Sequence, residues 1–119
     1  MTRNRLLLLA LFLASVSQGV ALASGPIWEP GGTKCIPNFR DERPVGYICV
    51  KVERGSIYAK TGILKGDNVL AIGGQSMAVD SEKAIDLWKE FEKVETTTVV
   101  VERGDKVIAL QKPARNGVR

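Results

Sequence analysis

The centre of the chain, residues 55–75, reads GSIYAKTGILKGDNVLAIGGQ. Its first half predicts a short helix over residues 57–61. Ser56 precedes this helix and can cap it, because a serine hydroxyl accepts a hydrogen bond from an amide of the first helical turn. Gly62 follows the helix and can adopt the left-handed conformation in which many helices end. Both ends of the helix are therefore set by local sequence.

The second half of this stretch predicts a turn, a strand and another turn. Lys65-Gly66-Asp67 has the composition of a tight turn, and Gly73-Gly74 that of a second one. Between them, Val69–Ile72 is a short apolar run typical of a buried strand. We expect Ile63 and Leu64, which join the helix to the first turn, to pack inward.

The residues before this stretch predict a β-hairpin. Apolar residues alternate with polar ones over residues 36–39 and again over residues 45–52, and Asp41-Glu42-Arg43 supplies a polar turn between them. Pro37 and Pro44 cannot donate a backbone hydrogen bond. We therefore expect the first strand to lie at an edge of the sheet, with limited pairing on one side.

The residues after the central stretch predict one long helix and a second hairpin. The helix runs from Ser81 to about Val94, with Asp80 as its N-cap. Strands over residues 96–101 and 106–110 flank a turn at Gly104-Asp105. The apolar positions of the helix fall on one stripe, which is typical of a helix that packs on a sheet: Ala84, Leu87, Trp88, Phe91 and Val94.

Taken in order, these elements predict an α+β fold, a small antiparallel β-barrel or sandwich with one short and one long helix. Residues 55–75 resemble the central signature of bacterial PDZ domains, in which a small-residue helix ends in glycine and Lys-Gly-Asp leads into a strand. With residues 36–39, 45–47 and 99–105, the chain is most similar to the periplasmic PDZ domain of the C component of type II secretion systems. The resemblance covers residues 35–110.

The resemblance implies a peptide-binding groove. In PDZ domains a partner peptide adds as an extra strand between an edge strand and the long helix. Carried onto this chain, the groove residues are Ile36, Asn38 and Phe39 on the strand and Ala84, Ile85 and Trp88 on the helix. Ile85 lies beside the apolar stripe and is therefore available to a groove, whereas a tryptophan at the position of Trp88 is more often a core residue than a contact residue. No Gly-Leu-Gly-Phe loop precedes the strand, which disfavours capture of a C-terminal carboxylate.

The N-terminus predicts a secretory signal peptide over residues 1–23. Arg3 and Arg5 precede an apolar run over residues 6–16, and Ala21-Leu22-Ala23 has the small-x-small pattern of a cleavage site. Cleavage would leave an exported chain, in the periplasm or secreted. The alternative is a retained helix that anchors the protein in the inner membrane.

Cys35 and Cys49 are the two cysteines of the chain. In an exported protein an even number of cysteines favours a disulfide. Closing this loop would stabilise the fold by about 3 kcal/mol. The alternative is two reduced cysteines that act as small buried apolar residues.

The composition of the remaining residues predicts a leader, a domain and a tail. Residues 24–34 contain two prolines and three glycines, which predicts a flexible leader, and the domain is expected over residues 35–111. Residues 112–119 are expected to form a polar tail. Without residues 1–23, the chain has 15 basic and 13 acidic side chains. The basic ones are not clustered in sequence as they are in nucleic-acid-binding proteins.

Catalysis and metal binding are disfavoured by residue type. The chain has no histidine, which excludes Ser-His-Asp and Cys-His catalysis and removes the commonest zinc ligand. Ser56 and Lys60 are one helical turn apart, but such pairs are common at helix ends. We expect neither an enzyme, a cofactor nor a metal.

The sequence therefore predicts a non-catalytic, periplasmic protein-interaction module. Its partner would be another envelope or secretion protein, met by strand addition in a process such as type II-like secretion. Two alternatives remain open, a disulfide-stapled structural protein of the envelope and an adaptor that recruits substrates to an envelope protease. Membrane contact is expected only if the signal is retained as an anchor.

Overall fold

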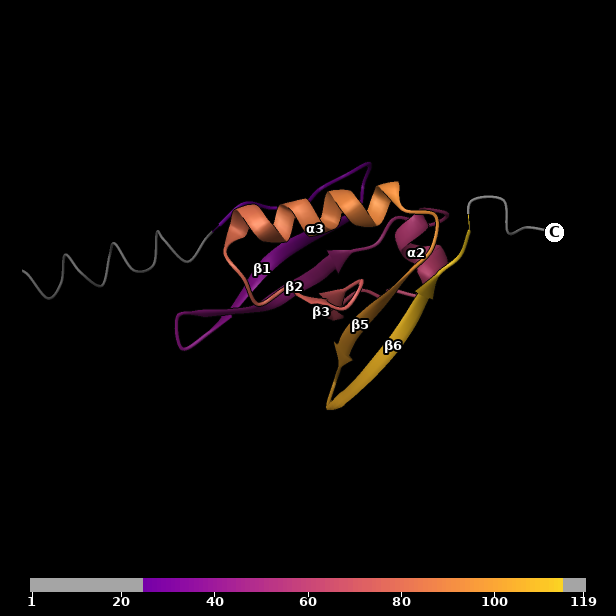
Figure 1. Ribbon diagram of the computed structural model, residues 1–119. Helices are drawn as coiled ribbons and strands as arrows, with labels where there is room; N and C mark the ends of the chain where they lie inside the picture. The colour runs from indigo at the N-terminus through magenta and orange to yellow at the C-terminus, as the bar shows by residue number, and fades with distance from the viewer. Residues whose placement is uncertain (1–24, 115–119) are drawn as a thin grey trace, which may run out of the picture.

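The computed structural model describes residues 25–114, which form an antiparallel sheet with one short and one long helix (Figure 1). The sheet order is β1-β2-β3-β5-β6, and β4 pairs with β3. The elements are β1 (Lys34–Arg40), β2 (Arg43–Lys51), α2 (Ile57–Thr61), β3 (Asn68–Ile72), β4 (Gln75–Ser76), α3 (Ser81–Lys93), β5 (Thr97–Arg103) and β6 (Lys106–Lys112). The predicted signal peptide lies outside the described residues.

The α+β class and the two predicted helices are confirmed, but the sheet is not closed into a barrel. β1 and β6 lie at opposite ends of the strand order and do not pair with each other within residues 25–114. Closure of a barrel requires pairing between strands that are distant in the sequence. The local alternation of apolar and polar residues predicts single strands but not which strands pair. No helix among these residues is long and apolar enough to cross a membrane.

Both helices begin at their predicted caps. The Ser56 hydroxyl accepts a hydrogen bond from the Ala59 amide at 3.2 Å, and the Asp80 carboxylate accepts one from the Lys83 amide at 3.1 Å. Gly62 ends α2 with a φ of 103°, in the left-handed region that favours glycine. Local side-chain chemistry therefore fixes where α2 and α3 start.

The predicted first hairpin is confirmed, and a two-residue turn joins its strands. Asp41 and Glu42 have φ angles of 52° and 65°, which is the conformation that type I′ hairpin turns require. Arg43, expected in the turn, instead pairs with Arg40 at the end of the ladder. β1 is hydrogen-bonded to β2 alone among the named strands, so Pro37 lies on an edge strand as expected.

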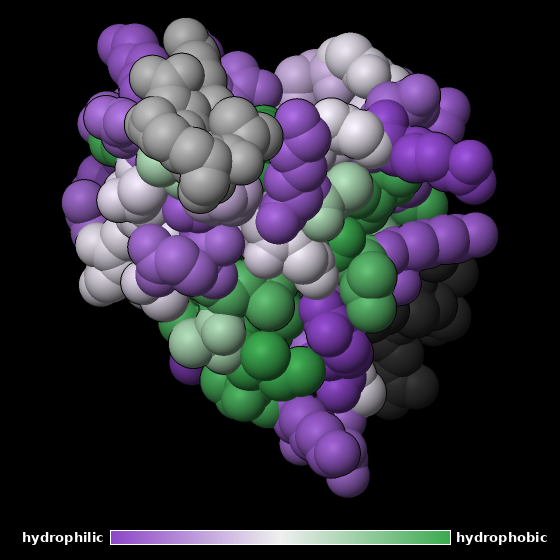
Figure 2. All heavy atoms as spheres, turned by 90° about the vertical axis from the view of Figure 1, so that its right-hand side faces the viewer, coloured by the Kyte–Doolittle hydropathy of each residue, from purple (hydrophilic) through white to green (hydrophobic). Residues whose placement is uncertain are grey.

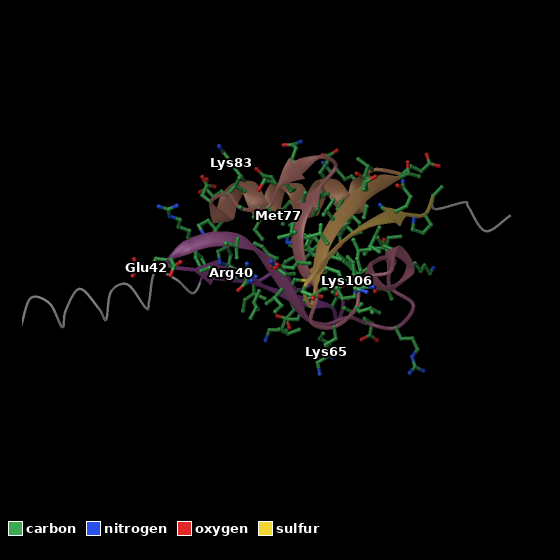
Figure 3. All side chains as sticks on the ribbon, turned by 90° about the horizontal axis from the view of Figure 1, so that it is seen from below. Arg40, Glu42, Lys65, Met77, Lys83 and Lys106 are labelled. Carbon is green, nitrogen blue, oxygen red and sulfur yellow. A yellow bond between two sulfur atoms is a disulfide. The ribbon has the colours of Figure 1, made fainter. Side chains whose placement is uncertain are left out.

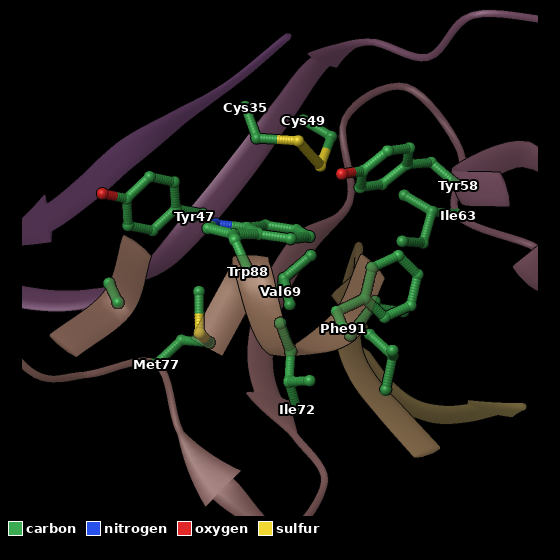
Figure 4. Close-up of a cluster of buried hydrophobic side chains, with 13 residues drawn as sticks. Cys35, Tyr47, Cys49, Tyr58, Ile63, Val69, Ile72, Met77, Trp88 and Phe91 are labelled. Atoms are coloured by element: carbon green, nitrogen blue, oxygen red, sulfur yellow. A yellow bond between two sulfur atoms is a disulfide. The ribbon is translucent and has the colours of Figure 1, made fainter. Parts of the chain in front are cut away.

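The core is organised around Trp88 of α3 (Figure 4). Its ring lies 6.0 Å from that of Tyr47, 5.8 Å from that of Tyr58 and 6.1 Å from that of Phe91, measured between centroids. The charged residues Arg40, Glu42 and Lys65 lie on the outside of the fold, whereas Met77 is fully buried (Figure 3). α3 thus closes the core over one face of the sheet.

One expected core residue points to solvent. Ile63 is buried as predicted, but the Leu64 side chain is 53% exposed. The Leu64 amide donates to the Asp67 carboxylate at 2.8 Å, and the Asp67 amide donates back to the Leu64 carbonyl at 3.0 Å. Because the backbone of Leu64 is committed to this turn, its side chain is directed away from the core.

The packed structure extends beyond both predicted limits of the domain. Before Cys35, Trp28 forms an isolated antiparallel bridge with that residue. At the other end, Lys112 belongs to β6 and is buried, and its ammonium group donates to the Phe91 carbonyl at 2.6 Å and to the Val94 carbonyl. The ammonium therefore satisfies carbonyls at the C-terminus of α3 that have no partner in the helix. Lys112 is structural and is not part of a loose tail.

Candidate peptide-binding groove

The predicted Cys35–Cys49 disulfide is present and links β1 to β2 (Figure 4). The two residues are direct partners in the strand register. Their backbone groups do not form hydrogen bonds with each other. The amide and carbonyl of Cys35 bond to Trp28, whereas those of Cys49 bond to Asp67 and Gly66. The disulfide therefore fastens β1 to the sheet at the residue whose outward backbone groups pair with Trp28.

The outer edge of β1 has little pairing capacity left. In an antiparallel strand, alternate residues direct their backbone groups to the same neighbour. Since Cys35 faces outward, Pro37 is the next residue to do so, and proline has no amide hydrogen. The Cys35 amide and carbonyl are thus the main pairing groups of this edge.

Trp28 occupies those groups. Its amide donates to the Cys35 carbonyl at 2.8 Å and its carbonyl accepts from the Cys35 amide at 2.8 Å. In Figure 1 the indigo segment before β1 runs beside α3. Residues 25–28 consequently lie between the edge strand and the long helix, where a partner strand was expected.

The Trp28 side chain is held by ring stacking and by a hydrogen bond. Its ring stacks on that of Trp88, with centroids 6.1 Å apart and an interplanar angle of 7°. Its indole Nε1–H donates to the Tyr58 hydroxyl at 2.8 Å, and the same hydroxyl donates to the Glu92 carboxylate at 2.5 Å. Apolar contact and a polar anchor both fix the indole, as is common for buried tryptophan.

The Tyr58 hydroxyl keeps its proton. Burial, followed by the hydrogen bond to Glu92, raises the pKa of Tyr58 far above its ordinary value. The proton is directed to Glu92, which leaves the oxygen lone pairs as acceptors. Tyr58 therefore presents a fixed acceptor to whatever lies above Trp88.

The other end of the segment lies against α3 and β1 together. The Tyr47 hydroxyl donates to the Pro26 carbonyl at 3.1 Å. A Cβ atom on Gly25 would lie 3.0 Å from Cγ of Pro37 and 3.4 Å from Oγ of Ser81, so the chain passes close to both elements there. An open hollow at this end has a mixed polar and apolar lining, made by Pro26, Ser81, Glu82, Ile85, Asp86 and Lys89.

The predicted groove residues are placed on three different surfaces. On α3, Ala84 and Trp88 are fully buried, whereas Ile85 is half-buried and lines the hollow. On β1, Cys35 and Pro37 share the side of the sheet on which Tyr47 and Cys49 lie, since directly paired residues have the same orientation. Strand alternation places Ile36 and Asn38 on the opposite side. Phe39 follows an irregularity in the register and is half-buried.

Trp28, Tyr58 and Pro26 were not predicted to lie at the candidate groove. Trp28 is the one aromatic residue in the proline- and glycine-rich stretch 24–34, and a large apolar side chain in such a stretch is a signal for docking. Tyr58 was assigned only to a short helix. Its role depends on Glu92, 34 positions away, which local patterns do not report.

The alternative catalytic pair receives no support from the geometry. The Ser56 hydroxyl donates to the Glu53 carbonyl at 2.7 Å and accepts from the Ala59 amide, so it serves as the helix cap. Within residues 25–114, no group of three or more His, Cys, Asp or Glu side chains is placed to hold a metal ion.

Comparison with known proteins identifies the fold. No protein-family model matches the sequence, and no curated protein matches it either. Among solved structures, the PDZ domain of EpsC from Vibrio cholerae aligns with a TM-score of 0.54 at 17% identity, over 86% of this chain and 96% of that chain. The PDZ domain of the pullulanase C protein of the type II secretion system from Klebsiella pneumoniae, solved in complex with a fatty acid, aligns with a TM-score of 0.52 at 18% identity. That alignment covers 70% of this chain and 89% of that chain. The resemblance in the sequence is thereby confirmed, and the chain has the fold of a PDZ domain.

Proposed function

We propose that this protein is a non-catalytic interaction module that binds an extended segment of another protein by strand addition between β1 and α3. The observation that carries the proposal is the backbone pair between Trp28 and Cys35, because it places an extended segment at this edge. Strand addition needs an edge strand with free backbone groups and a neighbouring surface for side chains. β1 is such an edge strand once Trp28 leaves the Cys35 backbone groups, and the Ile85 side of α3 provides the surface.

We further propose that the module acts outside the cytoplasm. Its disulfide is typical of proteins in oxidising compartments, and the N-terminal sequence has the pattern of a cleaved signal. The partner is then another envelope or secretion protein. A process related to type II secretion is favoured by the structural similarity to the PDZ domains of EpsC and pullulanase C.

The proposed location is tested by intact-mass measurement of the protein isolated from the cell envelope. We expect the mass of a chain that begins at Ser24 and carries the Cys35–Cys49 disulfide. A mass that retains residues 1–23, found in the membrane fraction, would show that the segment is an anchor instead.

The proposed groove is tested by comparing two charge substitutions, one on α3 beside the groove and one on the far edge strand β6. Ile85→Lys places an ammonium group in the hollow, whereas the control Val107→Lys places one on β6, where the side chain is already 66% exposed. We expect the tagged protein to recover a saturable partner from an envelope extract, the first variant to lose it and the control to keep it. Retention by folded Ile85→Lys would contradict use of this groove.

A further inference from the structure

The N-terminal segment and a partner strand would need the same backbone groups. Trp28 bonds to both the amide and the carbonyl of Cys35, and Pro37 offers no amide at the next outward position. Each amide hydrogen makes one good bond at a time. A second strand therefore pairs with this part of β1 only after residues 25–28 leave.

Side chains of the segment alternate as those of a bound strand do. Trp28 stacks on Trp88, and Pro26 lines the hollow beside Ile85. Between them, Ile27 is 47% exposed and directed outward. Two positions two residues apart thus contact the groove, which is the side-chain spacing of strand addition.

The position above Trp88 is built for a tryptophan. Tyr58 gives its proton to Glu92 and accepts the indole N–H of Trp28. A phenylalanine in the same place would stack on Trp88 but would leave the Tyr58 oxygen without this donor. A site that hydrogen-bonds one ligand group discriminates strongly against a ligand that lacks it.

A tight turn connects Trp28 to β1. Gly31 and Gly32 have φ angles of 50° and 97°, and the Thr33 amide donates to the Pro30 carbonyl at 3.1 Å. This tight turn holds the segment close to β1 at a high effective concentration. A free peptide must therefore compete with an intramolecular one.

We propose that residues 25–28 are an intramolecular ligand of the groove, and that the partner segment replacing them carries a tryptophan at the position of Trp28. The inference rests on the proposed function, since it specifies what the groove binds and how access is controlled. The partner strand would present its tryptophan to Tyr58 and Trp88 and an apolar residue two positions earlier to Ile85.

The probe is a synthetic peptide with the sequence of residues 25–32, GPIWEPGG, titrated onto the exported, disulfide-bonded protein. Trp28→Ala removes the stacking and the indole hydrogen bond of the internal segment. We expect this variant to bind the peptide at least about tenfold more tightly than the unchanged protein, because a larger fraction of its grooves is open.

The matched control replaces the tryptophan of the peptide with phenylalanine. We expect the Trp28→Ala variant to bind the control peptide about tenfold more weakly than it binds GPIWEPGG. Adding Tyr58→Phe to this variant should abolish the difference between the two peptides. Persistence of the preference without the Tyr58 hydroxyl would overturn the assigned tryptophan site.

Two outcomes separate this inference from the proposed function. Equal binding of GPIWEPGG to the unchanged protein and to Trp28→Ala would overturn internal occupancy while leaving the groove in place. No binding to folded Trp28→Ala would overturn the ligand role of residues 25–28. The pair Ile85→Lys and Val107→Lys would still decide whether an envelope partner uses the groove.

A measurement on the unchanged protein keeps the inference testable if Trp28→Ala does not fold. Amide hydrogen exchange at Trp28 and Cys35 reports release of the segment, whereas exchange at Val101 in β5 reports opening of the core. We expect the first two amides to exchange at least about tenfold faster than the third. Exchange of all three at one rate would mean that the segment is a permanent part of the fold, and would overturn the inference.

Discussion

The two edges of the sheet differ in what lies against them. β1 is covered by residues 25–28 and borders α3, whereas β6 pairs only with β5 within the described part of the chain. Val107 on β6 is 66% exposed. Figure 2 views the side on which α2 and the end of β6 lie, and shows apolar side chains gathered among polar ones.

Exposure alone therefore does not identify a binding edge. An uncovered edge strand can pair with other chains and needs protection. β6 begins at the exposed residue Lys106, whose charge limits unwanted pairing at that end of the strand. β1 is covered by a segment held through one backbone pair, one aromatic stack and two hydrogen bonds that involve side chains. The edge whose cover is proposed to be displaced is therefore the better candidate for regulated binding.

The largest expected effect comes from Trp88→Ala, which removes the residue that the groove and the core share. Trp88 is fully buried and contacts four other rings. We expect the free energy of unfolding to fall by about 3 to 5 kcal/mol, measured by urea denaturation. Val107→Ala on the other edge is the control and should change it by less than about 0.5 kcal/mol. Similar losses in both variants would contradict the asymmetry of the two edges.

The next largest effect is expected on removal of the disulfide by a Cys35→Ala, Cys49→Ala double substitution. Loss of the cross-link should destabilise the protein by about 3 kcal/mol, since the unfolded chain gains freedom. Because Cys35 also carries the pair with Trp28, amide exchange at Trp28 should accelerate more than at Ile108 in β6. Equal acceleration at both sites would show that the disulfide does not act locally on the β1 edge.

A smaller effect is expected from Tyr58→Phe. This substitution removes the acceptor of the Trp28 indole and the donor to Glu92. We expect a loss of about 1 to 2 kcal/mol in thermal or urea unfolding, with faster exchange of the Trp28 amide. Trp28→Phe in the same background should then cost less than it does in the unchanged protein, because the hydrogen bond is already absent. Additive losses would contradict the assigned hydrogen bond.

The smallest effect concerns pH and the link between β1 and β5. Hydrogen bonds from Arg40 and then from Asn68 lower the pKa of Glu102. A carboxyl group whose pKa is lowered by folding stabilises the protein above its ordinary pKa, and this contribution is lost as the pH falls through the lowered value. On acidification, we expect the melting temperature of the unchanged protein to fall slightly more steeply than that of Glu102→Gln. The difference between the two proteins should be smaller at high salt, because the Arg40–Glu102 pair lies near the surface. Identical pH profiles of the two proteins at low salt would contradict a stabilising role of the Arg40–Glu102 pair.

Sequence reasoning succeeded where the signal is local. Ser56 and Asp80 cap the helices that they precede, and Pro37 marks an edge strand. The disulfide also followed from local counting and the expected compartment. In each case the decisive chemistry lies within a few residues or in the number of cysteines.

The missed features depend on contacts between distant positions. Trp28 meets Tyr58 across 30 positions and lies in a stretch whose composition predicted a flexible leader. Lys112 reads as a surface residue, yet its ammonium group binds carbonyls of α3 some 20 positions away. Composition describes a segment by itself, whereas burial also depends on the surface against which the segment packs.

The stack of Trp28 on Trp88 gives the protein an intrinsic optical reporter. These are the two tryptophans of the chain, so ultraviolet emission from indole comes entirely from this pair. Departure of residues 25–28 would transfer Trp28 from a ring stack into water while Trp88 stayed with Tyr47, Tyr58 and Phe91. A red shift of the emission without unfolding would therefore signal an open groove, and a stopped-flow trace of that shift would time its opening without any attached dye.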